Sequence, residues 1–397
     1  MTTRWTVLVY MVADTGEGFY QNAMEDVTEM MRAQFDERVR VVVHADAPSQ
    51  WDTKCWEVTG APEGKIGEAK PIDSYGTGLL DFVQKSVDRY ESEYYLLVLW
   101  GHGEGIDWKE KVLAGRPPSS AIVGAGKRFA PGSQGVIEVG ELGKALAELR
   151  LGKKENIVVG FDACLMGMVE VYDEIQKYVG WVVAANDEIP VTGWPYTHIL
   201  NFLGADPEKK PMDLAEKIAD ICADWYSEND PESKVSFAAC DLSKGDALRE
   251  ATAHLADELE THIRNIAVRD AVVRARNFAE DLQEIAYVDL NAFCSELRKQ
   301  TAPMKHEALD NAADSVMKTL RDYSKNPQFS SNYPYAYAQD SRAVSICFPS
   351  ADSVGSIPNL RINWGSYKDL TFTRATHWYS FLTKFWDRRQ ARAASQG

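Results

Sequence analysis

The chain has 397 residues, of which 45% are hydrophobic and 11% aromatic, so it can bury a sizeable core and is not intrinsically disordered. Its 59 acidic residues outnumber its 43 basic ones, and the resulting formal charge of −16 argues against nucleic acid or an anionic membrane surface as a partner. Its 6 cysteines form no CxxC pair or tight cluster, which excludes a disulfide scaffold and a zinc framework. The length predicts two domains, or one large domain with an appendage.

The first part of the chain, residues 1–240, alternates between short apolar runs and amphipathic segments with a period near 3.6 residues. Several of the runs are almost continuous in Val, Leu, Ile and aromatic residues, which is typical of strands covered on both faces. The alternation predicts a mostly parallel sheet with helices on both sides. The expected strands are 6–12, 39–45, 94–100, 157–161, 182–185 and 235–239, and the expected helices are 19–34, 79–90, 139–149, 166–178 and 212–227.

Residues 103–135 interrupt this pattern with scattered Gly, Pro, Ser, Lys and Arg, and predict an unusually long loop of the kind that often has a functional role. The second part, residues 241–397, has a different character. It predicts two or three charged amphipathic helices between 242 and 323, a strand at 343–348 that returns toward the sheet, and a final helix at 372–387.

Two of the expected strands end in chemically reactive residues. His102, between two glycines, follows strand 94–100, and Cys164 follows strand 157–161. The carboxyl ends of parallel strands line the crevice where ligands bind, and a cysteine at a strand-to-helix junction has the positive end of a helix dipole beside it. The pattern predicts a dyad in which Cys164 attacks a carbonyl carbon, His102 transfers the proton, and the backbone N–H groups of Gly103 and Cys164 hold the oxyanion. Taken singly, a structural histidine and a core thiol are the alternatives.

The residues around these two positions resemble the caspase-like clan of cysteine peptidases, and within it the clostripain family. The resemblance extends over most of the chain and implies a caspase-like α/β/α sandwich with a largely helical C-terminal domain. It also implies an endopeptidase that acts on proteins, with His102 and Cys164 as its catalytic pair. The supporting stretches are TVLVYMVAD (6–14), EDVTEM (25–30), LWGHG (99–103), FDACLMGMVE (161–170), AANDEIPVTGWPY (184–196) and VSICFP (344–349).

The resemblance also implies a preference for cleavage after Arg or Lys. Asp162 matches an acidic residue that receives the basic side chain in such relatives, although it could instead cap the helix that follows. A second acidic residue of those relatives is replaced here by Thr192, with Asp187 and Glu188 nearby. A peptidase with an uncharged preference, its pocket shaped by Thr192, therefore stays an alternative. Trp194 either walls the pocket or packs in the core.

Members of the family are often zymogens that cut themselves between the His and Cys strands. Lys127 and Arg128 are the favoured candidates in the 103–135 loop, and Arg116 is less favoured because Pro117 follows it. A surface loop that is left uncut is the alternative. A catalytically silent binding or scaffold protein with the same fold is the competing functional class.

No cofactor is expected to be required and no metal ligands are assigned. Some relatives need calcium, so a site involving Asp14, Asp46 and Asp52 is left open, although no EF-hand spacing exists. The expected partners are proteins or peptides with basic residues, without nucleic acid or membrane. An apolar stretch near the N-terminus lacks a small-x-small cleavage site, which favours a cytoplasmic location over a signal peptide.

Overall fold

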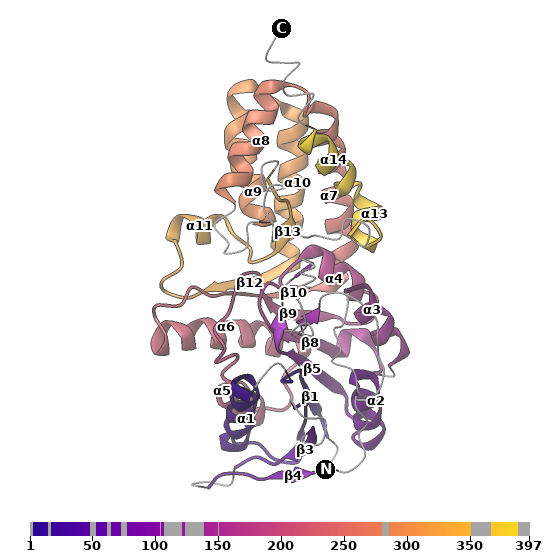
Figure 1. The fold of residues 1–397 in the computed structure, drawn as a ribbon, viewed down its shortest axis with the longest axis vertical. Helices are drawn as coiled ribbons and strands as arrows, with labels where there is room; N and C mark the ends of the chain where they lie inside the picture. Colours follow the sequence, from indigo (N-terminus) through magenta and orange to yellow (C-terminus); the bar gives the residue numbers. More distant parts are fainter. Residues whose placement is uncertain are drawn as a thin grey trace, which may run out of the picture.

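A computed structural model describes residues 3–14, 17–47, 53–61, 65–72, 78–103, 105–106, 121–123, 139–149, 151–279, 286–350 and 367–387 (Figure 1). Its centre is a nine-stranded sheet in which five adjacent strands run parallel and two antiparallel strands extend each side. In spatial order the strands are β12 (Ser324–Phe329), β10 (Ser236–Asp241), β9 (Trp181–Ala185), β8 (Ile157–Asp162), β5 (Tyr94–Trp100), β1 (Trp5–Met11), β2 (Val39–Ala45), β3 (Lys54–Val58) and β4 (Ala69–Pro71).

Every strand that the sequence predicts between residues 1 and 240 is present within two residues of its expected ends. Their side chains are almost entirely buried, as the continuous apolar runs indicate. The sequence pattern misses β3, β4 and β12, which are short or polar and lie toward the edges of the sheet, where the demand for apolar residues is weaker.

Helices cover both faces of this sheet, as predicted (Figure 1). Each face has its own apolar core, and most helices lie within a few residues of their predicted ends. On one face lie α1 (Glu17–Arg32), α5 (Tyr196–Ala205) and α6 (Pro211–Asn229), and on the other lie α2 (Leu79–Arg89), α3 (Val139–Glu148) and α4 (Val169–Ile175).

The helical C-terminal part lies at the end of the sheet where α4 and β12 are found (Figure 1). Between residues 242 and 323 the described chain forms four long helices rather than the two or three expected. None of the described helices is both long and apolar enough to cross a membrane. The helices of this part are α7 (Gly245–His262), α8 (Ile266–Phe278), α9 (Leu290–Thr301), α10 (Glu307–Tyr323), α11 (Tyr335–Asp340), α13 (Thr371–Thr376) and α14 (Trp378–Trp386).

The expected strand at 343–348 exists, but it does not join the large sheet. Strand β13 (Ser345–Cys347) pairs with β11 (Tyr287–Asp289) instead. The backbone N–H of Ser345 also donates to the carbonyl of Gly167 at 2.7 Å, so β13 is held between β11 and the segment that follows Cys164. The strand that the C-terminal part adds to the large sheet is β12, whose polar sequence gives no strand signal.

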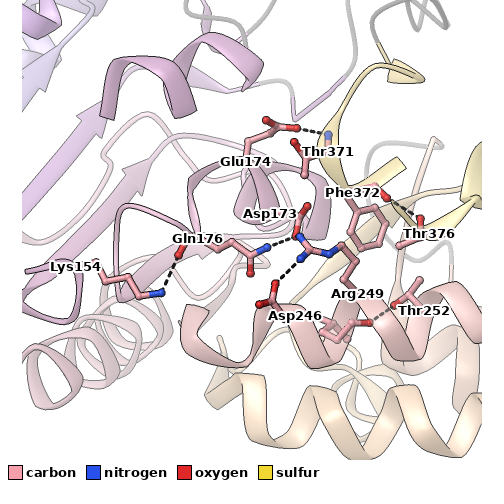
Figure 2. Close-up of polar contacts among 11 residues, drawn as sticks. Lys154, Asp173, Glu174, Gln176, Asp246, Arg249, Thr252, Thr371, Phe372 and Thr376 are labelled. Carbon is pink, nitrogen blue, oxygen red and sulfur yellow. Dashed lines mark hydrogen bonds and ion pairs between the residues drawn. The ribbon is translucent and has the colours of Figure 1, made fainter. Parts of the chain in front are cut away.

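A partly buried ion pair connects the C-terminal helices to the sheet domain (Figure 2). Arg249 of α7 donates to the carboxylate of Asp173 of α4 at 2.7 Å, and it also pairs with the exposed Asp246. The Asp173 side chain is only 4% exposed, and burial raises the pKa of its carboxyl to about 6 although Arg249 opposes the shift. The amide of Gln176 donates to the same carboxylate. The ion pair therefore joins α7 to α4 in surroundings where an unpaired charge is costly.

Replacing Arg249 with methionine should lower the free energy of unfolding by about 1–3 kcal/mol, because the buried Asp173 carboxylate loses its cation. Urea unfolding followed by circular dichroism measures the change. The matched control is Asp246→Ala, which removes the other partner of the same arginine; Asp246 is 83% exposed, so its loss should change the free energy by less than about 0.5 kcal/mol. Equal effects of the two substitutions would contradict the prediction.

Candidate active site

The two strand ends that carry the predicted dyad are adjacent in the structure. Strands β5 and β8 are parallel neighbours, with Trp100 opposite Asp162, and the backbone N–H of Gly101 donates to the carbonyl of Asp162 at 3.1 Å. Gly103 then packs directly on the nucleophile segment, since a Cβ atom at this position would lie 2.0 Å from the carbonyl oxygen of Cys164. The backbones that bear His102 and Cys164 therefore meet at the carboxyl edge of the sheet, as the sequence predicts.

The thiol of Cys164 is partly buried against the backbone of Ile189. Its Sγ accepts a hydrogen bond from the Ile189 N–H at 3.4 Å and donates to the Ile189 carbonyl at 3.5 Å. Burial raises the pKa of the Cys164 thiol to about 11, and the nearby carboxylates, Glu188 first among them, add to the shift. The expectation that a helix dipole stabilises the thiolate is wrong, because α4 begins only at Val169 and Leu165 has a left-handed φ of 62°.

His102 is exposed and belongs to β6 (His102–Gly103), which pairs with β7 (Ala121–Val123) from the long segment between the two motifs. Its ring stacks on Phe19 of α1, with ring centroids 4.2 Å apart and an interplanar angle of 8°. Phe19 also packs on Trp100 at a centroid distance of 4.7 Å. Nothing in the sequence pattern singles out Phe19, because its position against His102 depends on how α1 packs across the sheet.

The carboxylate of Asp162 is 2% exposed and is bound by the loop that precedes α5 and by the first residue of that helix. Its Oδ2 accepts from the Trp194 backbone N–H at 3.1 Å and from the Tyr196 hydroxyl at 2.8 Å, while Oδ1 is buried without a hydrogen-bond donor among the described residues. Burial raises the pKa of Asp162 to about 7. The helix-cap alternative is wrong, because the N-cap residue of α4 is Met168.

One loop, residues 187–194, contacts both Cys164 and Asp162. Beyond the contact of Ile189 with the thiol, Gly193 lies against the Asp162 carboxylate: a Cβ atom there would be 2.9 Å and 3.1 Å from its two oxygens, and its φ is +63°. Thr192 is exposed, and its hydroxyl lies 3.1 Å from that of Tyr226. The loop therefore covers the Asp162 carboxylate and also contacts the Cys164 thiol.

Trp194 is 1% exposed and packs over the sheet at Gly160, where a Cβ atom would lie 2.5 Å from the indole. This position agrees with the core alternative for its side chain rather than with a pocket wall. What Trp194 provides to Asp162 is its backbone N–H.

The acidic residues near Asp162 are not those that the loop sequence offers. The carboxylate of Asp187 accepts from the Glu188 N–H at 2.8 Å and from the Tyr333 hydroxyl at 3.1 Å, and Glu188 is exposed. Two acids of α1 interact with Asp162 through their charge: Asp26 and Glu29. Asp26 is buried, and it accepts from the indole N–H of Trp100 at 2.7 Å. The sequence pattern does not single out Asp26, although this residue lies in the stretch at 25–30 that carries the family resemblance.

The candidate self-cleavage residues Arg116, Lys127 and Arg128 lie outside the described residues, as does Asp52. Asp46 accepts from the imidazole of the buried His44 at 3.0 Å. Within the described ranges no group of three or more His, Cys, Asp or Glu side chains is arranged to hold a metal ion.

Known proteins share the family and the fold of this chain. The model of the clostripain family matches residues 9–386. The fold is similar to the inactive zymogen of a C11 protease from Parabacteroides distasonis, with a TM-score of 0.66, 17% identity and coverage of 95% of this chain and 99% of that one.

It is also similar to a secreted C11 cysteine protease from Bacteroides thetaiotaomicron in complex with an irreversible peptide inhibitor, with a TM-score of 0.63, 17% identity and the same two coverages. No curated protein sequence matches the chain. The family match spans nearly the whole chain and includes both strand ends, so the chain belongs to the clostripain family and is a cysteine peptidase.

Proposed function

We propose that the chain is an endopeptidase in which Cys164 is the nucleophile and His102 the proton carrier. The observation that carries the proposal is the packing of the Gly103 backbone on Cys164, which places the ends of β5 and β8 side by side. The Cys164 sulfur attacks the peptide carbonyl carbon while its proton passes to His102. His102 then protonates the leaving amine, and water hydrolyses the thioester that remains.

The oxyanion that forms in each step needs hydrogen-bond donors that are in place before the reaction. The backbone N–H groups of Gly103 and Cys164 are the proposed donors, since their segments are in direct contact. A glycine is required at 103, because any side chain there would collide with the backbone of Cys164.

We expect Cys164 to rest as a neutral thiol and to lose its proton to His102 only as the sulfur attacks the substrate. Because burial raises the pKa of Cys164 to about 11, the thiol is neutral near pH 7. Its contacts with Ile189 must be exchanged for contacts with the substrate before the sulfur can attack. The loop at 187–194 is therefore expected to move when a peptide binds.

A preference for Arg or Lys at the residue before the cleaved bond (P1) is supported by Asp162. Its buried carboxylate has one oxygen without a donor, and the loop that covers it also touches Cys164. A cationic side chain that enters here would receive a negative partner next to the nucleophile. Self-cleavage at Lys127 or Arg128 would follow from the same preference.

Fluorogenic peptides that differ only at P1 test the proposed function, assayed before and after nicking with trypsin that is then inhibited. Turnover after Arg and Lys, and little after uncharged residues, is the expected result. Turnover mainly after uncharged residues would favour the alternative in which Thr192 shapes the pocket. Absence of turnover under both conditions would contradict the proposal.

Replacing Phe19 with leucine is expected to lower kcat/KM by about two- to fivefold, because the stacked ring holds the His102 imidazole in one orientation. The fluorogenic peptides measure the change. Phe19→Tyr, which keeps an aromatic face, is the matched control and should keep the wild-type kcat/KM. An unchanged kcat/KM in Phe19→Leu would contradict the positioning role.

A further inference from the structure

We propose that Asp26 of α1 determines specificity as the second carboxylate of the P1 pocket, paired with Asp162. The inference rests on the proposed function, since it concerns how the same site recognises a cationic side chain. The second carboxylate of the pocket would then come from α1 and not from the loop at 187–194.

Trp100 places the two carboxylates together. It is the direct cross-strand neighbour of Asp162, so both side chains project from the same face of the sheet, the face covered by α1, α5 and α6. On that face the indole N–H of Trp100 donates to the Asp26 carboxylate at 2.7 Å. Asp26 is 4% exposed and Asp162 is 2% exposed, so water solvates neither carboxylate.

Neither carboxylate of this pair forms an ion pair with a Lys or Arg among the described residues. Glu29, one turn along α1, adds a further acid, and the cationic groups near Glu29 are His198 and the exposed Arg32. Burial raises the pKa of Asp26 well above its usual value, and the charge of Asp162 raises it further. The groups that face the pair from α5 and α6 are the hydroxyls of Tyr196 and Tyr226 and the thiol of Cys222, all of which are neutral at pH 7.

Two buried carboxylates without a cation are stable only if they share a proton or gain a positive partner. A guanidinium or ammonium group at P1 is such a partner, and a guanidinium can bind two carboxylates through its several N–H donors. Asp187 cannot fill this role in the present arrangement, because its carboxylate is engaged by Tyr333 and by the Glu188 N–H. Asp26 therefore provides the second negative charge that the loop sequence lacks.

The test uses the full chain with Asp26→Asn and two peptides that differ only at P1, where one has arginine and the other citrulline, its neutral isostere. Asparagine keeps an oxygen for the Trp100 indole, so the variant is expected to fold. KM for the arginine peptide should rise by about tenfold or more, while KM and kcat for the citrulline peptide stay within about twofold. The matched control is Glu25→Gln, the same loss of charge at the exposed neighbouring position, which should leave both peptides unchanged.

Two further variants separate recognition from support of the fold. Asp26→Glu keeps the charge and should keep a preference for arginine over citrulline. Trp100→Phe removes the indole donor and leaves the charges, so it should also keep that preference. If Asp26→Asn slows both peptides equally, or if Asp26→Glu loses the preference as fully as Asp26→Asn, the role of Asp26 in specificity is overturned.

Failure of this inference differs from failure of the proposed function. If the wild-type protein prefers arginine, Asp162→Asn loses that preference and Asp26→Asn retains it, the inference alone is wrong. If the wild-type protein does not prefer arginine over citrulline, the Arg/Lys specificity on which the inference rests is wrong as well.

Discussion

Replacing Cys164 with alanine should abolish peptide turnover, with a loss of kcat on the order of 10⁴-fold or more, because the proposed thioester forms on the Cys164 sulfur. His102→Ala should cause a comparable loss, and the double variant should be little worse than either, since the two residues act as a unit. The fluorogenic peptide with arginine at P1 provides the measurement. If the wild-type chain cuts itself, the Cys164→Ala protein should stay intact. Mass spectrometry of the two purified proteins measures the difference.

The matched control for this prediction is Cys55→Ala. Cys55 is a buried thiol on β3, and burial raises its pKa to about 12, so it has no part in the proposed reaction. Its replacement should leave turnover unchanged even if the protein becomes less stable. Turnover that persists in Cys164→Ala would show that another residue is the nucleophile.

The replacement Asp162→Asn should remove the preference for Arg and Lys, with kcat/KM for these peptides falling by about 10²–10³-fold. The cationic side chain would lose the buried carboxylate below the loop, whereas a peptide with an uncharged P1 residue would lose little. Asparagine keeps one oxygen that can accept from Trp194 or Tyr196, which limits damage to the loop. An unchanged specificity profile would refute the pocket role of Asp162.

The same substitution has a separate effect on stability that depends on pH. Burial raises the pKa of Asp162 to about 7, above its value in the unfolded chain, so the folded protein binds this proton more tightly. Wild-type stability should therefore fall as pH rises from about 4 to about 7, and the neutral asparagine should remove this part of the slope. Urea unfolding of both proteins at pH 5 and pH 8 measures it. Parallel pH dependence in the two proteins would mean that the carboxylate is not held protonated by the fold.

Local sequence was enough to predict the central strands and the two strand ends. Strands β1, β5 and β8 lie under helices on both faces, and this double burial requires the continuous apolar runs that make them visible in the sequence. Strand β12 gives no such signal, because it lies at the edge of the sheet and half of its surface tolerates polar residues. Its pairing with β10 depends on how the C-terminal helices bring the chain back to the edge of the large sheet.

The candidate site, like the sheet, could be predicted from the sequence only in part. The sequence by itself determined the residue types of the site and their order, since His102 and Cys164 each follow a buried strand whose end is fixed by local pattern. Only the tertiary structure decided their surroundings. Packing of α1 on the sheet brings Phe19 to His102 and Asp26 to Trp100, and these contacts join segments that are far apart in the chain.

The ionisation of the site was also decided by the tertiary structure. The sequence predicted a thiolate favoured by a helix dipole, but a dipole acts only near the helix end, and α4 begins five residues after Cys164. Burial raises the pKa of the Cys164 thiol instead, although the hydrogen bond from Ile189 opposes the shift, and burial also raises the pKa of Asp162 against the hydrogen bonds from Tyr196 and Trp194. Desolvation depends on every group packed around an atom, so it emerges only when the whole chain has folded.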